Sequence, residues 1–347
     1  MKDTIIDANF PKTADGRVYH LGIKYGEVAN RIVTVGSISR AEGIAKHLDP
    51  SPRPFSLSSE RGFLTITGRY GGVPVSIVSI GMGAPNVDFF IREVRECVRG
   101  DMLVIRLGSC GCLTDLPVGC LVLPKASVAV TRNLDYDFIN GDPWRTPYIL
   151  SKPLHQALEK TRPAAVQNPI VTNVVNASTD SFYSSQGRQT SFHDHNAGLI
   201  NHLKDTVPDI ASLEMETYWI FHLAASWRAF ARPSPTTNSP LTTGPVLPSN
   251  DLACSNTADF SGDTITSVQP TKEASQRPVI RAAAVQMVFA SRQSQDFITP
   301  ERVSELEQWS GRGVLEALRT MNVPNERLHP EEGSVWELRE RRVSETG

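Results

Sequence analysis

One run of the chain, Asp101–Cys112 (DMLVIRLGSCGC), restricts the possible folds more than any other. Its first part, Met102–Leu107, is apolar and rich in branched side chains, which predicts a strand covered on both faces that leads into a glycine-punctuated loop. Arg106 interrupts the run, and a buried guanidinium needs an anionic partner because it cannot lose its proton. Gly108 lets the backbone pass close to a ligand, and Ser109 adds a hydroxyl. The run predicts an oxyanion pocket at the C-terminal edge of a sheet; the alternative is an arginine paired with a carboxylate of the fold itself.

Composition and charge limit the classes of protein to which the chain can belong. With 347 residues, 40% of them hydrophobic, it can bury a sizeable core. A formal net charge of −2 and the lack of a long basic run argue against nucleic acid as a partner. No apolar run approaches the roughly 20 residues that span a bilayer, and Met1–Asp7 lacks the basic start and apolar core of a signal peptide. We expect a cytoplasmic protein that binds neither nucleic acid nor a membrane.

The five cysteines indicate reduced thiols rather than a disulfide framework, because their number is odd and they are scattered. Cys110 and Cys112 have the wrong spacing for a redox pair, and no second cysteine pair completes a zinc site. We therefore expect no metal centre.

Apolar runs that alternate with helical patterns predict a mostly parallel or mixed sheet with helices packed around it. The expected strands are 31–36, 63–67, 73–80, 102–107, 119–130, 170–176 and 279–289, and the expected helices are 40–48, 87–98, 153–161 and 300–318. The strands 63–67 and 73–80 form a hairpin around Gly71–Gly72.

The chain is expected to form a single domain over residues 1–347 with two irregular segments. Residues 232–278 are rich in proline, serine and threonine and hold few bulky apolar side chains, so they cannot bury enough surface to offset the entropy of ordering. We expect a flexible surface insertion there. Residues 325–347 are highly charged, and we expect a loose C-terminal tail.

Polar clusters follow several of the expected strands. After the strand 31–36, Gly36 and a serine turn lead into the helix that begins at Arg40. Free N–H groups at a helix start favour an anion, although many α/β loops share this pattern.

A second cluster is Asp180–Arg188 (DSFYSSQGR). Gln186 offers a donor and an acceptor, whereas Arg188 offers donors only. Side by side they can read the acceptor–donor–acceptor edge of uracil while Phe182 packs on the ring. The alternative is a solvated loop whose polar residues cap helices.

Two more clusters carry charge. Glu214 and Glu216 flank Met215 at the entry to an apolar helix, and on an extended segment both carboxylates would share a face and could grip the hydroxyls of a ribose. The alternative is two acids favoured at a helix N-terminus by its dipole. Arg292 ends a late apolar strand, where a structural ion pair would explain it equally well.

The ordered set of clusters resembles the nucleoside phosphorylase family, and within it the branch that acts on uridine. The likeness runs from Val18 to Leu318 and leaves out the insertion. It implies an α/β fold with a central twisted mixed β-sheet flanked by helices in three layers. It also implies reversible phosphorolysis of uridine to uracil and ribose 1-phosphate.

The resemblance implies a role for each site residue. It assigns phosphate to Gly36, Arg40, Arg61, Arg106 and Ser109. It assigns uracil to Phe182, Gln186, Arg188 and Arg292, and ribose to His20, Ser109, Glu214, Met215 and Glu216. Catalysis would rest on Arg106, Glu216 and Arg292. His20 and Arg61 are expected from a neighbouring subunit, which makes a homodimer with shared active sites the smallest competent unit.

Three departures from the family pattern matter. Gly-Ser-Ile stands at Gly36 where the family has Gly-Asp-Pro. Gly62 stands where relatives have a glutamate that holds an intersubunit cation, so we predict no metal site. Ser291–Arg292 replaces the aspartate with which bacterial purine phosphorylases protonate the purine, and this favours a pyrimidine substrate.

Neither a metal nor an organic cofactor is chemically necessary, since inorganic phosphate is itself a substrate. The enzymatic alternatives are a purine-directed phosphorylase and a nucleosidase that uses water. A catalytically silent nucleoside-binding paralogue is the alternative outside enzymology.

Overall fold

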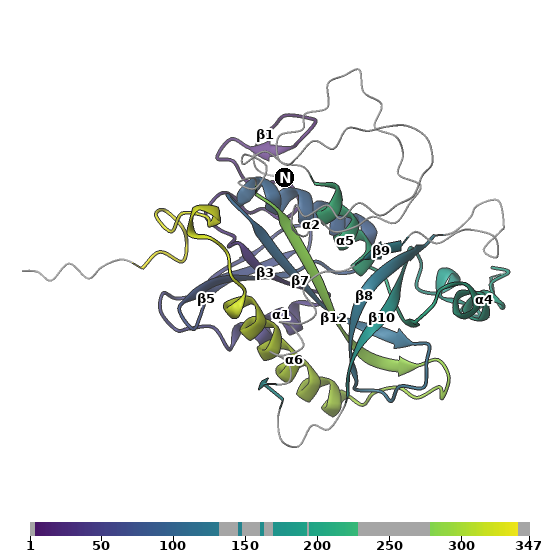
Figure 1. Cartoon of the computed structure of the whole chain (residues 1–347). Helices are drawn as coiled ribbons and strands as arrows, with labels where there is room; N and C mark the ends of the chain where they lie inside the picture. The colour runs from purple at the N-terminus through teal and green to yellow at the C-terminus, as the bar shows by residue number, and fades with distance from the viewer. Residues whose placement is uncertain are drawn as a thin grey trace, which may run out of the picture.

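The computed structural model describes residues 4–131, 160–162, 169–192, 194–227 and 278–338, together with the backbone of 145–147. Its centre is a mixed ten-stranded sheet whose main path runs β11–β10–β8–β12–β7–β3–β6–β5–β4, with β9 paired to β8 (Figure 1). The strands are β3 (Arg31–Val35), β4 (Phe55–Ser58), β5 (Leu64–Tyr70), β6 (Val73–Ser79), β7 (Met102–Cys112), β8 (Leu121–Val130), β9 (Arg145–Pro147), β10 (Ile170–Thr179), β11 (Ile210–Glu214) and β12 (Ile280–Ser291).

Helices cover both faces of this sheet, which confirms the predicted three-layer α/β class. The helices are α1 (Ile38–Ala45), α2 (Ala84–Cys97), α4 (Leu199–Thr206), α5 (Thr217–Ser226) and α6 (Pro300–Thr320). One apolar core packs α1 and α6 against the sheet, with Ile105 and Trp309 among its members. The other core packs α2 and α5 on the opposite face, with Val104 and Phe221 among its members. Neighbouring residues of β7 thus point into different cores, as alternation along a strand requires.

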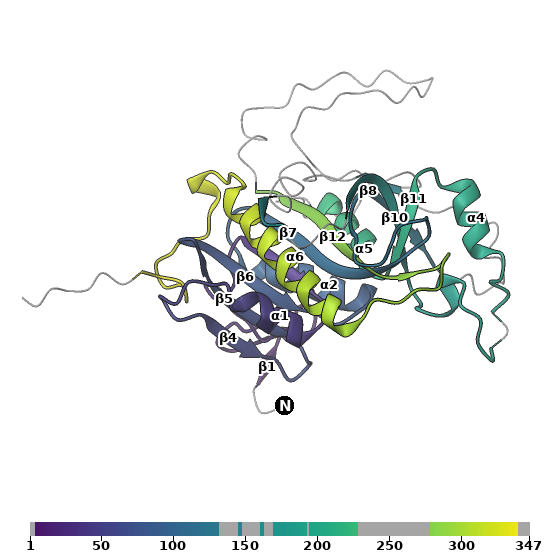
Figure 2. The same ribbon diagram turned by 90° about the horizontal axis from the view of Figure 1, so that it is seen from below.

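Five of the strands close into a ring that the sequence did not reveal. β11 pairs in parallel with β10 and antiparallel with β7, while β8 and β12 complete the circuit (Figure 2). The closure brings the end of β11 beside the end of β7, where Leu213 pairs with Gly111.

The expected glycine-punctuated loop after Leu107 is wrong. Gly108–Cys112 continues the strand, because β12 pairs with it residue by residue and β11 closes it from the other side. Glycines here let strand backbones approach one another rather than form a turn.

Local sequence signals predicted several other elements near the observed bounds, whereas β4, β11 and α4 were not among the expected elements. The hairpin of β5 and β6 turns at Gly71 and Gly72, which both have positive φ. Helix α6 begins at Pro300 behind the N-cap Thr299, as a proline in the first helical turn favours.

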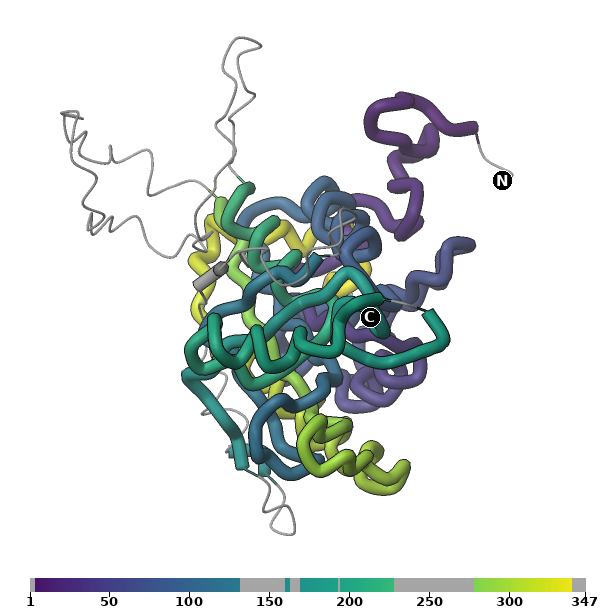
Figure 3. Tube along the Cα trace, turned by 90° about the vertical axis from the view of Figure 1, so that its right-hand side faces the viewer, coloured from purple at the N-terminus to yellow at the C-terminus, as the bar shows by residue number. Residues whose placement is uncertain are grey.

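The N-terminal part of the described chain lies at the edge of the molecule. Strands β1 (Ile5–Ile6) and β2 (Lys12–Thr13) form a separate two-stranded sheet, and the N-terminal segment lies at the periphery (Figure 3). Lys12 Nζ pairs with Glu96 of α2 at 3.3 Å.

The expectation of a loose segment from residue 325 is wrong for residues 325–338. This stretch packs against the end of the sheet, with Trp336 1% and His329 4% exposed. Burial of the Trp336 indole and the His329 imidazole offsets the conformational entropy lost when this segment is ordered, although its sequence is highly charged. Residues 339–347, most of the insertion 232–278 and most of the expected helix 153–161 lie outside the described residues.

Within the residues that are described, no helix is both long enough and apolar enough to cross a membrane. Cys97, Cys110, Cys112 and Cys120, the cysteines within that part of the chain, are free and buried.

Candidate active site

Arg106 lies in the middle of β7 with 3% of its surface exposed. Its Nη2 donates to Glu216 Oε2 at 2.8 Å, whereas its Nε and Nη1 are buried and have no hydrogen-bond partner among the described residues. The backbone of Gly108 and Gly36 lies against the guanidinium, since a Cβ at these glycines would sit 3.4 Å from Nε and 3.5 Å from Nη2. The arginine thus pairs with a carboxylate of the fold, as the alternative interpretation expects. It also keeps two buried donors, and the predicted oxyanion pocket stays a prediction.

Glu216 connects three elements at this point. It is the N-cap residue of α5 and lies 4% exposed. Its Oε2 binds Arg106, and its Oε1 accepts the N–H of Gly83 at 2.7 Å from the loop before α2. The carboxylate is thus held by the guanidinium of Arg106 and by the backbone N–H of Gly83, in the glycine-containing loop 81–83.

Glu214 performs the helix-capping role that the sequence left open. Its Oε2 accepts the N–H groups of Glu216 and Thr217, both at 2.9 Å, in the first turn of α5. Its Oε1 accepts the amide of Asn176 at 2.7 Å and the hydroxyl of Ser178. Burial, and then the charge of Glu216, raise the pKa of Glu214. Both carboxylate oxygens of Glu214 are thus hydrogen-bonded within the fold. The expectation that Glu214 and Glu216 share a face is wrong, because Glu214 instead accepts the backbone N–H of Glu216.

Arg40 reaches the same region from α1. Its N–H donates to the N-cap Ser37 at 3.3 Å, which fixes the first turn of the helix. Its Nε donates to Glu307 of α6 at 2.7 Å and its Nη1 to the carbonyl of Leu107 at 3.4 Å. Burial lowers the pKa of Arg40, and the carboxylate of Glu307 opposes this decrease. The positive charge of Arg106 lowers the pKa of Arg40 further, which indicates that the two cations are neighbours. Ser109, two residues beyond Leu107, is exposed.

The aromatic and amide cluster lies after β10. Gln186 is 2% exposed in the short 3₁₀ helix Ser184–Gln186, and its Nε2 donates to Thr179 Oγ1 at 2.9 Å. Arg188 donates to Gln186 Oε1 and stacks on Phe182, with the guanidinium 3.8 Å from the ring centroid. The hydroxyl of Thr179 also donates to the carbonyl of Glu214 at 3.3 Å, so this cluster connects to the acids described above.

Arg292 adds a second guanidinium to the cluster. Its N–H donates to Cys112 at the end of β7 at 2.9 Å, and its Nη2 donates to the carbonyl of Gly187 at 3.3 Å. Its Nη1 is buried without a hydrogen-bond partner. Burial and the charge of Arg292 lower the pKa of Arg188 to about 10. The two arginines thus form a cationic group with which no carboxylate of the described residues pairs. Met215, between the two acids, is half-buried.

His20 and Arg61 lie in a separate cluster. His20 Nδ1 is 2.6 Å from Glu93 Oε1 of α2, and its ring stacks on Phe89 with centroids 3.7 Å apart. Arg61 lies over the Tyr19 ring at 4.7 Å and donates to its hydroxyl. All hydrogen bonds and ring contacts of His20 and Arg61 within the described chain stay in this neighbourhood or in the turn at residue 59, so one chain does not bring them to Arg106.

Sequence reasoning missed the residues that hold these groups in place. In the sequence, Glu93 and Glu307 are ordinary acids on amphipathic helices. Asn176 and Thr179 are polar residues near the end of a strand, and nothing else distinguishes them. The glycine at 83 carried a signal, because two glycines after a strand suit a close backbone approach.

No cluster of three or more histidine, cysteine or acidic side chains in the described part of the chain could hold a metal ion. Two cavities, of about 620 Å³ and 380 Å³, lie away from the predicted site residues.

A sequence profile of the phosphorylase superfamily matches residues 30–229, more than half of the chain. The chain belongs to this superfamily. The match includes Gly36, Arg40, Arg106 and both acids of the Glu-Met-Glu motif, and it stops before Arg292.

Two curated members of the superfamily show equal identity and different named substrates. A uridine phosphorylase of Thermococcus kodakarensis is 28% identical over 228 residues, which covers 65% of this chain and 78% of the relative. A DeoD-type purine nucleoside phosphorylase of Brevibacillus brevis is also 28% identical over 228 residues, covering 65% of this chain and 88% of the relative.

Solved structures agree with the fold. A structure from a study of two uridine phosphorylases of the oomycete Phytophthora capsici superposes with a TM-score of 0.71 and 32% identity, covering 92% of this chain and all of the other. A Trypanosoma brucei nucleoside phosphorylase described as showing uridine phosphorylase activity gives a TM-score of 0.65, covering 90% of this chain and all of the other, but at 19% identity it supports the fold alone.

Proposed function

We propose that this superfamily member is a uridine phosphorylase that cleaves uridine with phosphate to give uracil and ribose 1-phosphate, in cytoplasmic pyrimidine salvage. One observation carries the proposal. A hydrogen-bonded chain runs from Arg188 through Gln186 and Thr179 to Glu214 and Glu216, and ends at Arg106. This chain supports the proposal, because it connects the residues that we propose to bind the pyrimidine with the arginine that we propose to bind phosphate.

The phosphate end of the proposed site uses guanidinium groups. Arg106 has two unpartnered donors, and Arg40 is held next to it by Glu307. Phosphate would lie beneath C1′ of the nucleoside, near the exposed Ser109. A phosphate oxygen then bonds to C1′ as the bond from C1′ to N1 breaks, and positioning and charge stabilisation provide the rate.

The base end of the proposed site stabilises the leaving group. The electron pair of the broken bond passes to uracil, whose oxygens become more negative before the ring takes a proton from water. Arg188 and Arg292 carry two positive charges with which no carboxylate of the described chain pairs, and within the same residues Arg292 keeps a buried unpartnered Nη1. Removing a donor of this kind commonly costs about 3–4 kcal/mol of transition-state stabilisation.

The ribose would lie between these ends. Glu216 is the carboxylate that we propose to contact its hydroxyls, with Met215 packed on the sugar. Glu214 would act through Glu216, since its oxygens are engaged with the first turn of α5. His20 and Arg61 would complete the site from a neighbouring subunit, so a homodimer is the smallest active unit.

A purine-directed phosphorylase is the second candidate, because a purine nucleoside phosphorylase is as similar in sequence as the uridine phosphorylase. The presence of Arg292 in place of an acid favours uridine: a guanidinium stabilises an anionic base and cannot protonate a purine.

The test compares uridine and inosine, each with and without phosphate, by the absorbance of the released base. We expect rapid cleavage of uridine only with phosphate. Arg188→Ala should lower kcat/KM for uridine at least 100-fold, whereas Arg92→Ala, on the exposed face of α2, should leave it unchanged. Faster cleavage of inosine would support the purine candidate, and cleavage without phosphate would indicate a nucleosidase.

A further inference from the structure

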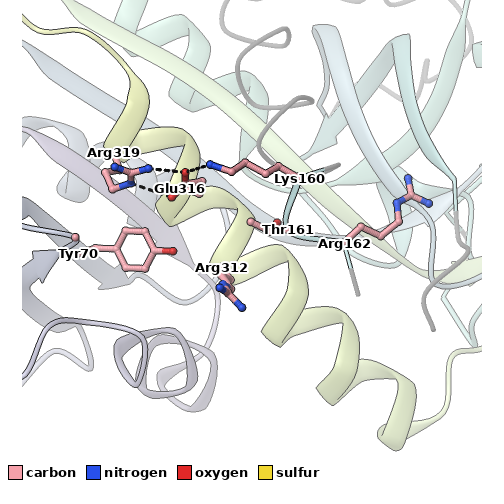
Figure 4. A pocket seen from close by; sticks show the side chains of 8 residues that line it. Tyr70, Lys160, Thr161, Arg162, Arg312, Glu316 and Arg319 are labelled. Atoms are coloured by element: carbon pink, nitrogen blue, oxygen red, sulfur yellow. Dashed lines mark hydrogen bonds and ion pairs between the residues drawn. The ribbon is translucent and has the colours of Figure 1, made fainter. Parts of the chain in front are cut away.

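The larger cavity, of about 620 Å³, lies between the turn that joins β5 to β6, the outer face of α6 and residues 160–162 (Figure 4). The side chains that line it include Tyr70, Lys160, Arg162, Arg312, Glu316 and Arg319. None of them belongs to the proposed active site, whose contact with α6 is at Glu307.

The lining of this cavity holds four cationic side chains and a single carboxylate. Glu316 accepts hydrogen bonds from Lys160 at 2.9 Å and from Arg319 at 2.7 and 2.9 Å. These bonds, those from Arg319 first, lower the pKa of Glu316 to about 2, so the carboxylate stays ionised and is already saturated with donors. It therefore cannot neutralise Arg312 as well.

Arg312 contributes a cation that nothing offsets. It is exposed and forms no hydrogen bond or ion pair with the described residues. Burial, and then the positive charge of Arg312, lower the pKa of His47, which follows α1 in the chain. Figure 4 shows the Tyr70 ring reaching toward α6 between Arg319 and Arg312.

Arg319, further along α6, is held in place. Besides its two bonds to Glu316, it packs against the turn at Gly71, where an added Cβ would lie 2.9 Å from Arg319 Cδ. A guanidinium held in this way loses little side-chain freedom when it binds a ligand.

We propose that this cavity binds a phosphate ester of about the size of a nucleoside monophosphate, independently of the active site. Arginine and lysine donors suit phosphate oxygens, and the excess of cations over carboxylates among the described lining residues favours an anion. Tyr70 offers a ring on which a planar base can stack, and the volume lies within the range of about 300–1,000 Å³ usual for small-molecule sites.

Calorimetric titration of the full chain with uridine 5′-monophosphate and, separately, with inorganic phosphate tests this assignment. Arg312→Glu and Lys160→Ala should each weaken nucleotide binding at least tenfold, whereas Lys204→Glu on α4 should not. Arg188→Ala, which disables the proposed pyrimidine site, should retain nucleotide binding.

Binding of the nucleotide more tightly than of inorganic phosphate supports the ester. Equal affinity for the two, loss of binding in Arg188→Ala, or unchanged affinity in Arg312→Glu would overturn the proposal. The thermal midpoints of the variants verify that each is folded.

Discussion

Arg106 and Glu216 form an ion pair in which the side chains are only 4% and 5% exposed, with Nη2 and Oε2 2.8 Å apart. The desolvation of two charges largely cancels their attraction, so such a pair contributes little net stability. Its position between β7, the loop before α2 and the start of α5 instead fixes where a cation and a carboxylate face the proposed substrates.

Replacing Arg106 by lysine should remove the planar set of donors while keeping the charge. We expect kcat to fall by about 100-fold to 1,000-fold, which corresponds to about 3–4 kcal/mol, and the KM for phosphate to rise. Steady-state kinetics at varied phosphate measure both effects. Arg92→Lys, in an exposed pair with Asp88, is the matched control and should keep full activity. Activity of Arg106→Lys within twofold of the parent would contradict the role.

Glu214→Gln should act on stability more than on recognition of the sugar. Glutamine presents an amide nitrogen where Oε2 now accepts two N–H groups, so the first turn of α5 loses its cap at a cost of about 1–3 kcal/mol. Urea unfolding measures this loss.

The ratio of kcat/KM for uridine to that for 2′-deoxyuridine should stay unchanged in Glu214→Gln and change in Glu216→Gln. A changed ratio in Glu214→Gln with unaltered stability would instead indicate direct contact with the ribose.

Co-expression of Arg61→Ala with Arg106→Gln tests the shared active site. Each variant alone should be nearly inactive. A mixed dimer would hold one intact site and one doubly altered site, so a random mixture should recover about a quarter of the parent activity. No recovery in purified mixed dimers would show that Arg61 acts within its own chain, and full activity of Arg61→Ala alone would show that it does not act in catalysis.

His329 should make stability depend on pH. Its Nδ1 accepts the N–H of Arg99 at 3.0 Å, and burial, followed by the charges of Arg99 and Arg95, lowers its pKa to about 4. The unfolded chain, with a histidine pKa of about 6.5, binds more protons between these values, so stability should fall as the pH drops from about 6.5 to 4.

The loss at His329 should amount to about 3 kcal/mol over that window. His329→Asn keeps an acceptor without the titration and should flatten the unfolding free energy between pH 4.5 and 6.5. The same substitution at His202 on α4 is the control. An identical pH dependence in His329→Asn would refute the assignment.

Much of the fold could be predicted from local patterns, because branched apolar runs, the glycines of the hairpin and Pro300 act within a few residues. The ring closed by β11 and β7 could not, since pairing between distant strands leaves no local signal. The same long-range pairing explains why Gly108–Cys112 is strand despite its resemblance to a loop.

The candidate site divides in the same way. Motifs identified Arg106, Gln186, Arg188 and Glu216, and the fold brings these four into one hydrogen-bonded chain. Glu93, which binds His20, and Glu307, which binds Arg40, lie far in sequence from these partners. Nothing in the sequence distinguishes them from other acids on the polar faces of helices.

The most direct test of the account is the product formed from uridine. With phosphate, ³¹P nuclear magnetic resonance should show ribose 1-phosphate appearing in equal amount to the uracil released, and neither should form without phosphate. Free ribose in place of ribose 1-phosphate, or no cleavage of uridine at any phosphate concentration, would contradict it.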